Sequence, residues 1–192
     1  MQSFLDYALK SAWLLLVLYW LWSAPRAKSH MHRQSLAVRI IAYWLPFLIA
    51  AGLLVSDNWF SLGFLYRRFL PDSLWIRGVG VALAIAGIAL ACWARHLLGR
   101  NWSMAVELKD EHELIQAGPY SIVRHPIYTG LLMGFIGTGL ENGEWRALIS
   151  IAIFSAFILY KLRVEERWLT ELFGSTYSRY KDRTKALVPG LL

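Results

Sequence analysis

Residues 126–162, PIYTGLLMGFIGTGLENGEWRALISIAIFSAFILYKL, hold two apolar runs separated by one short polar break. The first run covers residues 126–140 and the second covers residues 145–162. Only residues 141–144, Glu-Asn-Gly-Glu, join them, so helices formed by these runs must lie antiparallel as a hairpin. Both runs are shorter than the ~20 residues that a simple membrane crossing needs. We therefore expect them to extend at their ends, to tilt, or to lie partly in the membrane interface.

Three further apolar runs precede this hairpin. They cover residues 11–24 (extendable back to residue 4), residues 36–55 and residues 74–98, and Pro46 is expected to kink the second. Hydrophobic residues make up 57% of the 192, which is too apolar for a soluble domain of this length. The sequence predicts an all-α integral membrane protein with five transmembrane helices, the last two forming a tight hairpin.

Basic residues lie at the ends of the apolar runs and give the chain a formal net charge of +7. Charges in such places suit anionic lipid and membrane orientation, so we predict a lipid bilayer as partner and no nucleic acid. An outside N-terminus would place residues 25–39, 95–125 and 161–192 in the cytoplasm. These regions hold 15 of the 20 Lys and Arg residues, which favours an outside N-terminus and a cytoplasmic C-terminus. Any reaction site should then be cytoplasmic.

Small residues recur at helical spacing in two of the runs. They let helix backbones approach closely inside a membrane, so we expect both runs to pack tightly on neighbouring helices. Close approach of a ligand to the later run is a compatible alternative. The residues are Gly80, Ala84 and Gly87 in the run 74–98, and Gly130, Gly134, Gly137 and Gly139 in the run 126–140.

Arg-His-Pro-Ile-Tyr, residues 124–128, stands where the hairpin begins. Pro126 suits the first helical turn, so His125 falls at or beside the N-cap. A helix N-terminus attracts anions, Arg124 adds a full cation, and Tyr128 lies one turn further in. We predict a small receptor for an anionic group. The alternatives are a lipid anchor for Arg124, simple helix capping for His125 and an aromatic-belt position for Tyr128.

Two acidic residues, Glu165 and Glu166, come just after the last apolar run. Acidic side chains beside hydrocarbon are costly, so a functional role is the first hypothesis where they face the bundle interior. The alternative is a salt-bridged helix exit that pairs Lys161 with Glu165 and Arg163 with Glu166. Because a hairpin brings its two open ends together, we expect His125 to lie near Glu165.

These residues resemble a known family. The pattern RHPxYxG at residues 124–130, followed by Glu165-Glu166 and by FGxxYxxY at residues 173–180, resembles the isoprenylcysteine carboxyl methyltransferases. Their relatives include the phospholipid N-methyltransferases. The match covers about residues 100–189, and the earlier runs agree only in being apolar.

The resemblance implies S-adenosylmethionine as methyl donor, bound in a cytoplasm-facing pocket. The carboxylate of the donor suits the helix N-terminus and Arg124, and its ammonium and sulfonium suit acidic side chains and aromatic faces. Leu114 and Ile115 would pack on the adenine. The residues implied for cofactor binding are His112, Glu113, Leu114, Ile115, Tyr120, Arg124, His125, Pro126, Ile127, Tyr128 and Glu165.

The resemblance also implies a catalytic set. Glu165 and Glu166 match the acidic pair of the family. A basic residue shortly before that pair orients the substrate carboxylate in the isoprenylcysteine enzymes; here that position is Lys161, where the family has Arg, and Arg163 lies close by. The implied activity is methyl transfer to a lipophilic acceptor, with the carboxylate of an isoprenylcysteine-like substrate expected. A phospholipid amine, a quinone or a thiol remains an alternative acceptor.

Two other classes of function remain open: a membrane reductase that uses a nicotinamide cofactor, and a non-enzymatic membrane scaffold. We divide the chain into residues 1–98, three N-terminal transmembrane helices, and residues 99–192, a catalytic half that ends in an amphipathic tail helix. We expect Tyr177, Tyr180, Arg183 and Thr184 to belong to that tail helix and to fold over the pocket. The alternative is a solvated basic tail that lies on anionic lipid. The loop histidines at positions 30 and 32 have no Cys or carboxylate cluster, so we predict no metal site.

Overall fold

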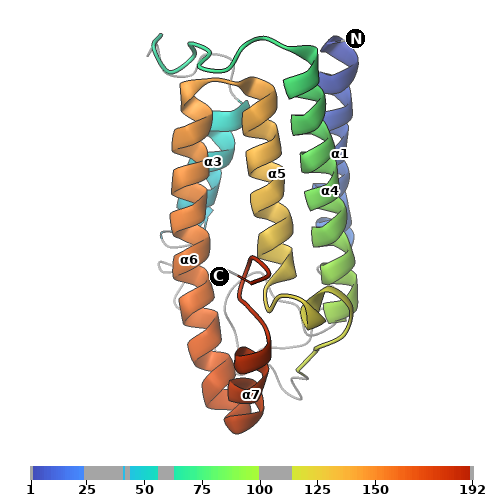
Figure 1. Cartoon of the computed structure of the whole chain (residues 1–192), viewed down its shortest axis with the longest axis vertical. Helices are drawn as coiled ribbons and strands as arrows, with labels where there is room; N and C mark the ends of the chain where they lie inside the picture. The colour runs from blue at the N-terminus through green and yellow to red at the C-terminus, as the bar shows by residue number, and fades with distance from the viewer. Residues whose placement is uncertain (1, 24–40, 42–43, 56–62, 100–113, 191–192) are drawn as a thin grey trace.

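The computed structural model of the chain describes residues 2–23, 41, 44–55, 63–99 and 114–190. Within this described part every regular element is helical: six α-helices and one 3₁₀ turn. Helix α5 (Pro126–Asn142) stands in the middle, and the other long helices run beside it along the long axis of the molecule (Figure 1). The prediction of an all-α chain is confirmed for these residues.

Three of the helices are long and apolar enough to cross a membrane. They are α1 (Gln2–Ser23), α4 (Leu74–Leu98) and α6 (Trp145–Phe173). All three leave large apolar side chains exposed, among them Leu15, Trp75 and Ile149. Because lipid rather than water tolerates such a surface, these helices have the character of membrane spans. The apolar runs predicted at residues 11–24 and 74–98 thus form α1 and α4.

Five spans are not shown by the described residues. Residues 36–40, 42 and 43 of the predicted run 36–55 lie outside them, and the end of the run forms the short helix α3 (Leu45–Val55), with Pro46 in the first turn. The run 126–140 forms α5, whose 17 residues are fewer than a simple crossing needs. None of those residues is exposed, so α5 is the inner helix of the bundle rather than part of its outer surface.

Glycines bring α4 and α5 into backbone contact, as predicted. A Cβ placed on Gly80 would lie 2.6 Å from the carbonyl oxygen of Gly137. Further along the two helices, a Cβ placed on Gly87 would likewise come too close to the carbonyl oxygen of Gly130. A larger residue at these positions would push the helices apart. On the opposite side of α5, Phe135 stacks on Phe154 of α6 with ring centres 3.7 Å apart.

The hairpin turn is shorter than predicted. Glu141 and Asn142 belong to α5, so only Gly143 and Glu144 connect it to α6. Gly143 has a left-handed backbone with φ 65°, which a residue with a side chain rarely adopts, and its N–H donates to the Gly139 carbonyl at 2.8 Å. The side-chain amide of Asn142 donates to the Leu54 carbonyl, 3.0 Å away, and so ties the end of α5 to α3.

The second correction concerns α6. The apolar run ends at residue 162, but the helix continues to Phe173 and carries the acidic pair along its last three turns. Gly174 then reverses the chain, and α7 (Ser175–Arg183) lies against the end of α6 at the bottom of Figure 1. The acidic residues therefore sit on a continuous helix and not in a segment after it.

Candidate active site

The predicted site residues that the structure describes gather at one end of the bundle. The N-terminus of α5, the last turns of α6 and helix α7 lie in the lower half of Figure 1, and the tail after α7 runs up toward the start of α5. A 3₁₀ turn, η4 (Gly118–Ser121), leads into α5 from the same side. This meeting follows from the hairpin, because the start of α5 and the late part of α6 must lie at the same end of two antiparallel helices.

Helix α7 is fixed by two tyrosines on its inner face. Tyr177 and Tyr180 are its only buried residues, and the other seven are exposed. The hydroxyl of Tyr180 donates to the carbonyl of Tyr120 at 2.5 Å, which joins α7 to η4. The predicted amphipathic tail helix is therefore present, and its aromatic face is turned toward the site.

After α7 the chain runs alongside the start of α5. The backbone N–H of Arg124 donates to the carbonyl of Lys185 at 2.8 Å, and that of His125 donates to the carbonyl of Ala186 at 3.0 Å. These two N–H groups precede the first helical turn and would otherwise need another acceptor. Residues 184–187, here called the tail strap, thus form one wall of the site.

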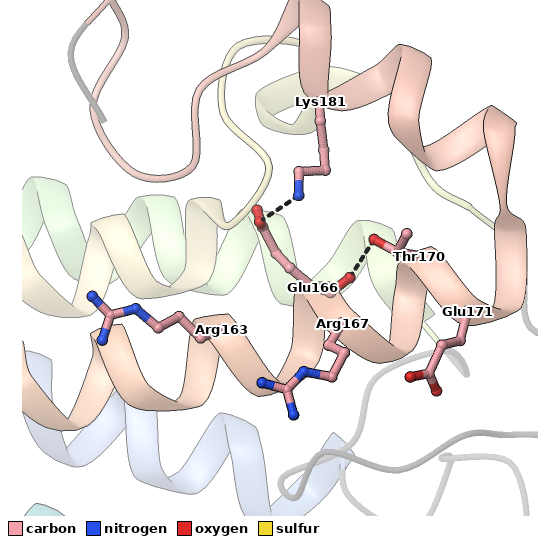
Figure 2. Close-up of a pocket in the computed structure, with 6 residues that line it drawn as sticks. All are labelled: Arg163, Glu166, Arg167, Thr170, Glu171 and Lys181. Atoms are coloured by element: carbon pink, nitrogen blue, oxygen red, sulfur yellow. Dashed lines mark hydrogen bonds and ion pairs between the residues drawn. The ribbon is translucent and has the colours of Figure 1, made fainter.

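Arg124 and Glu166 form an ion pair that joins α5, α6 and α7. Arg124 Nε lies 2.7 Å from Glu166 Oε1, and the side chains are 10% and 13% exposed. The Arg124 guanidinium also donates to the carbonyls of Lys181 and Thr184. Lys181 Nζ reaches the other oxygen of Glu166 at 3.3 Å (Figure 2). Arg124, predicted to receive a ligand anion, already has a carboxylate partner within the chain.

Glu166 lies one helical turn beyond the last residue of the apolar run, outside the segment that would cross a membrane. Burial alone would raise the pKa of its carboxyl. Hydrogen bonds from His125 and Arg124, together with the charges of both residues, outweigh burial and lower the pKa to about 2. Glu166 is therefore ionised throughout the physiological range and holds its cationic neighbours.

A second set of contacts surrounds Glu165. The hydroxyl of Tyr128 donates to Glu165 Oε2 at 2.6 Å, and the ring of His125 stacks on that of Tyr128 with centres 5.5 Å apart. His125 reaches both acidic residues, with Nδ1 at 4.0 Å from Glu165 and Nε2 at 3.4 Å from Glu166. Glu165 is 34% exposed, more than Glu166. The predicted closeness of His125 and Glu165 is confirmed.

An apolar cluster adjoins these charges. Ile127 and Tyr120 are buried together with Ala94 of α4, and Ile115 and Tyr128 pack against them. Leu114 is half-buried, and Pro126 is buried at the first position of α5. The remaining two predicted cofactor residues, His112 and Glu113, lie outside the described residues.

Lys161 and Arg163 point to different places, because residues two apart lie on nearly opposite sides of a helix. The ammonium of Lys161 lies over the Tyr128 ring, 5.5 Å from its centre. Arg163 is exposed and lines an open groove of about 380 Å³ between α6 and α7 (Figure 2). The residues that line the groove are Arg163, Glu166, Arg167, Thr170, Glu171 and Lys181.

Two residues at this end were not among the predicted site residues. Lys181 pairs with Glu166, and exposed lysines in a basic tail give no sequence signal for such a role. Tyr177 is 1% exposed, and its hydroxyl has no hydrogen-bond partner among the described residues. Burial raises the pKa of Tyr177, and the charges of Glu166 and Glu165 raise it further. Tyr177 belongs to the FGxxYxxY pattern, which supported the family resemblance and a tail helix but assigned no role to the hydroxyl.

Comparison with known proteins bears on what this arrangement does. Residues 75–176, from α4 to α7, match the model of the family described as phospholipid methyltransferase. The chain belongs to that family. The matched span includes the N-terminus of α5 and the acidic pair on α6, and it ends one residue before Tyr177. The family and the methyltransferase class predicted from the sequence are thereby confirmed.

Individual relatives carry more specific names. The chain is 28% identical over 143 residues to protein-S-isoprenylcysteine O-methyltransferase B of Arabidopsis thaliana, with 73% of each chain covered. It is 34% identical over 114 residues to protein-S-isoprenylcysteine O-methyltransferase of Saccharomyces cerevisiae, covering 58% of this chain and 48% of the relative. It is also 30% identical over 134 residues to the cobalt-zinc-cadmium resistance protein CzcN of Cupriavidus metallidurans, covering 68% of this chain and 58% of the relative.

Proposed function

We propose that this protein transfers a methyl group from S-adenosylmethionine to a lipophilic acceptor at the α5–α6–α7 end of the bundle. The observation that carries the proposal is the junction of an apolar cluster with a set of paired charges. The cluster around Ile115, Tyr120 and Ile127 adjoins Tyr128, whose hydroxyl is bonded to Glu165. All of these residues belong to the segment that matches the methyltransferase family.

The chemistry of this set fits the donor. S-adenosylmethionine has an aromatic base at one end, a carboxylate and an ammonium at the other, and a sulfonium between them. Leu114 and Ile115 would pack on the base, and the part-exposed carboxylate of Glu165 would pair with the ammonium. The proposed binding residues are His112, Glu113, Leu114, Ile115, Tyr120, His125, Pro126, Ile127, Tyr128 and Glu165.

Arg124 has a different role in this proposal. Its side chain is engaged by Glu166 and by two carbonyls of the chain after α6. We assign it to holding the tail strap and Glu166 in place, while the N-terminus of α5 would still attract the carboxylate of the donor. Glu166 and Lys181 complete this support and keep the walls of the site together.

The bound donor would supply an electrophilic methyl group, which a lone pair of the acceptor attacks in line. Alignment then provides most of the rate enhancement. We propose a carboxylate acceptor on an isoprenylcysteine-like compound, since two of the relatives described above are named for that reaction. Lys161, fixed over Tyr128, would orient the acceptor carboxylate, with Arg163 at the groove. A carboxylate needs no base, whereas an amine or a thiol would need His125 or Glu165 to accept its proton.

We further propose five membrane crossings with the N-terminus outside and the site in the cytoplasm. Basic residues support this, because seven of the 20 Lys and Arg follow residue 160 and lie at the site end. A lipophilic acceptor would then enter sideways from the bilayer, while the polar donor would enter from the cytoplasm. Helix α5 is short and buried, which fits a place among the spanning helices.

Binding of S-adenosylhomocysteine, the demethylated product, tests the proposal without any acceptor. Isothermal calorimetry on detergent-solubilised protein should show 1:1 binding that His125→Ala and Glu165→Ala weaken. No binding by the wild type would refute the proposed function. Binding that survives both substitutions would refute the assigned site. Binding of NADPH in place of the methyl-donor product would favour a reductase, and binding of neither would favour a scaffold.

The acceptor needs a separate measurement. Methyl transfer from labelled donor is compared between a farnesylcysteine analogue and a total lipid extract. A base-labile methyl ester on the analogue is the expected result. Label that appears only in phospholipid or in a thiol would replace the carboxylate by one of the other acceptors.

A further inference from the structure

The hydroxyl of Tyr177 is a buried polar atom with no hydrogen-bond partner among the described residues. Its side chain lies on the inner face of α7 and is 1% exposed, so bulk water does not replace the missing partner. A buried hydroxyl without a hydrogen bond costs free energy, and such a group in a folded protein calls for an explanation.

The neighbouring tyrosine shows that helix packing alone is not that explanation. Tyr180 lies three residues further along the same face, and its ring meets that of Tyr177 edge to face with centres 6.0 Å apart. The hydroxyl of Tyr180 is satisfied by the Tyr120 carbonyl. A phenylalanine at position 177 would fill the same apolar space as tyrosine, so packing by itself does not require the hydroxyl.

The surroundings of Tyr177 indicate which ligand group would satisfy it. Tyr177 shares the buried face of α7 with Tyr180, whose hydroxyl reaches Tyr120. It also lies one helical turn before Lys181, whose ammonium pairs with Glu166, so it stands beside the charged half of the site. Arg124 and Glu166 already bind each other, and Glu165 is the more exposed carboxylate of the pair. The free hydroxyl therefore lies near the place where the proposed donor would present its ammonium and carboxylate.

We propose that the Tyr177 hydroxyl hydrogen-bonds to the amino-acid end of the methyl donor, so that α7 supplies a direct cofactor ligand. This inference rests on the proposed function. A phenol hydroxyl suits that end of the donor, because it accepts from an ammonium and donates to a carboxylate. The hydrogen bond from Tyr180 to the Tyr120 carbonyl then holds α7 in the position at which Tyr177 can bind the donor.

Tyr177→Phe, with Tyr180→Phe as the matched control, tests this in the full-length protein. Calorimetry with S-adenosylhomocysteine should show a loss of affinity of about 10-fold or more for Tyr177→Phe, as expected for one hydrogen bond to a charged group. Affinity for 5′-methylthioadenosine, which lacks the amino-acid end, should not change. The unfolding temperature without ligand should stay constant or rise for Tyr177→Phe and fall for Tyr180→Phe.

Each result decides one question. If the wild type does not bind S-adenosylhomocysteine, the proposed function fails, and this inference fails with it. If the wild type binds and Tyr177→Phe binds equally well, only the inference fails. An equal loss of affinity for S-adenosylhomocysteine and for 5′-methylthioadenosine would show that the hydroxyl does not contact the amino-acid end, and it would overturn the inference. A drop in unfolding temperature as large as that of Tyr180→Phe would show a purely structural hydroxyl and would also overturn the inference.

Discussion

Glu166→Gln removes the carboxylate that joins α6 to Arg124 and Lys181 while keeping the size of the side chain. The structure sets the magnitude, because the pKa of Glu166 is lowered from 4.5 to about 2. Each pKa unit corresponds to about 1.4 kcal/mol, so the ionised form stabilises the fold by about 3 kcal/mol at neutral pH. For a chain of this size, that loss would lower the unfolding temperature by roughly 6–12 °C.

The pH dependence gives the sharper test. The pKa of Glu166 is lower in the folded protein than in the unfolded chain. Its contribution is therefore fully present above about pH 4.5 and is lost as the pH falls toward 2. The difference in unfolding temperature between wild type and Glu166→Gln should be large at pH 5. It should shrink steadily as the pH falls from about 4.5 toward 2.

The measurement is thermal unfolding followed by tryptophan fluorescence in a non-ionic detergent at a series of pH values. Glu165→Gln is the control, because the glutamine oxygen still accepts from Tyr128 and the pair between Arg124 and Glu166 stays intact. The control should lose much less stability at pH 7. A difference for Glu166→Gln that is below 1 kcal/mol, or that does not depend on pH, would refute the reasoning.

Two further substitutions test the packing and the tail strap. Gly80→Ala places a Cβ 2.6 Å from a carbonyl of α5, about 0.8 Å inside ordinary contact, and should destabilise the fold by about 1–3 kcal/mol. Gly78→Ala, on the same helix with nothing within 4 Å, should leave the unfolding temperature nearly unchanged, and equal effects would contradict the close contact. Arg124→Lys keeps the charge but loses the forked contacts, so trypsin should cleave the segment after α6 several-fold faster. Arg183→Lys, at an exposed position, should leave the cleavage rate as in the wild type.

The helices could be predicted wherever the signal was local. The apolar run 74–98 gave α4 to the residue, and the run 11–24 gave the end of α1 but not its start at Gln2. Pro126 marked the start of α5 because proline suits the first helical turn. The hairpin followed from the short polar break alone. The end of α6 could not be predicted from hydropathy, since an apolar run shows where a membrane segment ends and not where its helix ends.

The site was predicted as a set of residues but not as a set of contacts. The order of RHPxYxG, the acidic pair and FGxxYxxY indicated a methyltransferase, and the hairpin predicted that His125 and Glu165 would meet. It was not possible to predict from these motifs that Arg124 would bind Glu166 rather than face a free pocket. Glu166 lies 42 residues from Arg124 in the chain, and the sequence offers several other acidic residues with which Arg124 could have paired.

The sequence by itself determined the helical class of the described residues and the hairpin, because each depends on composition or on spacing within one segment. It also supplied the residues that we propose carry the chemistry, through the order of their motifs. Only the tertiary structure decided how those residues pair. Helix α7 and the tail strap fold back onto α5, and this fixes which carbonyls and which carboxylate Arg124 meets. It also leaves the Tyr177 hydroxyl without a hydrogen-bond partner among the described residues. Hydrogen bonds and ion pairs depend on distances of a few ångströms between segments far apart in the chain, and local sequence does not encode those distances.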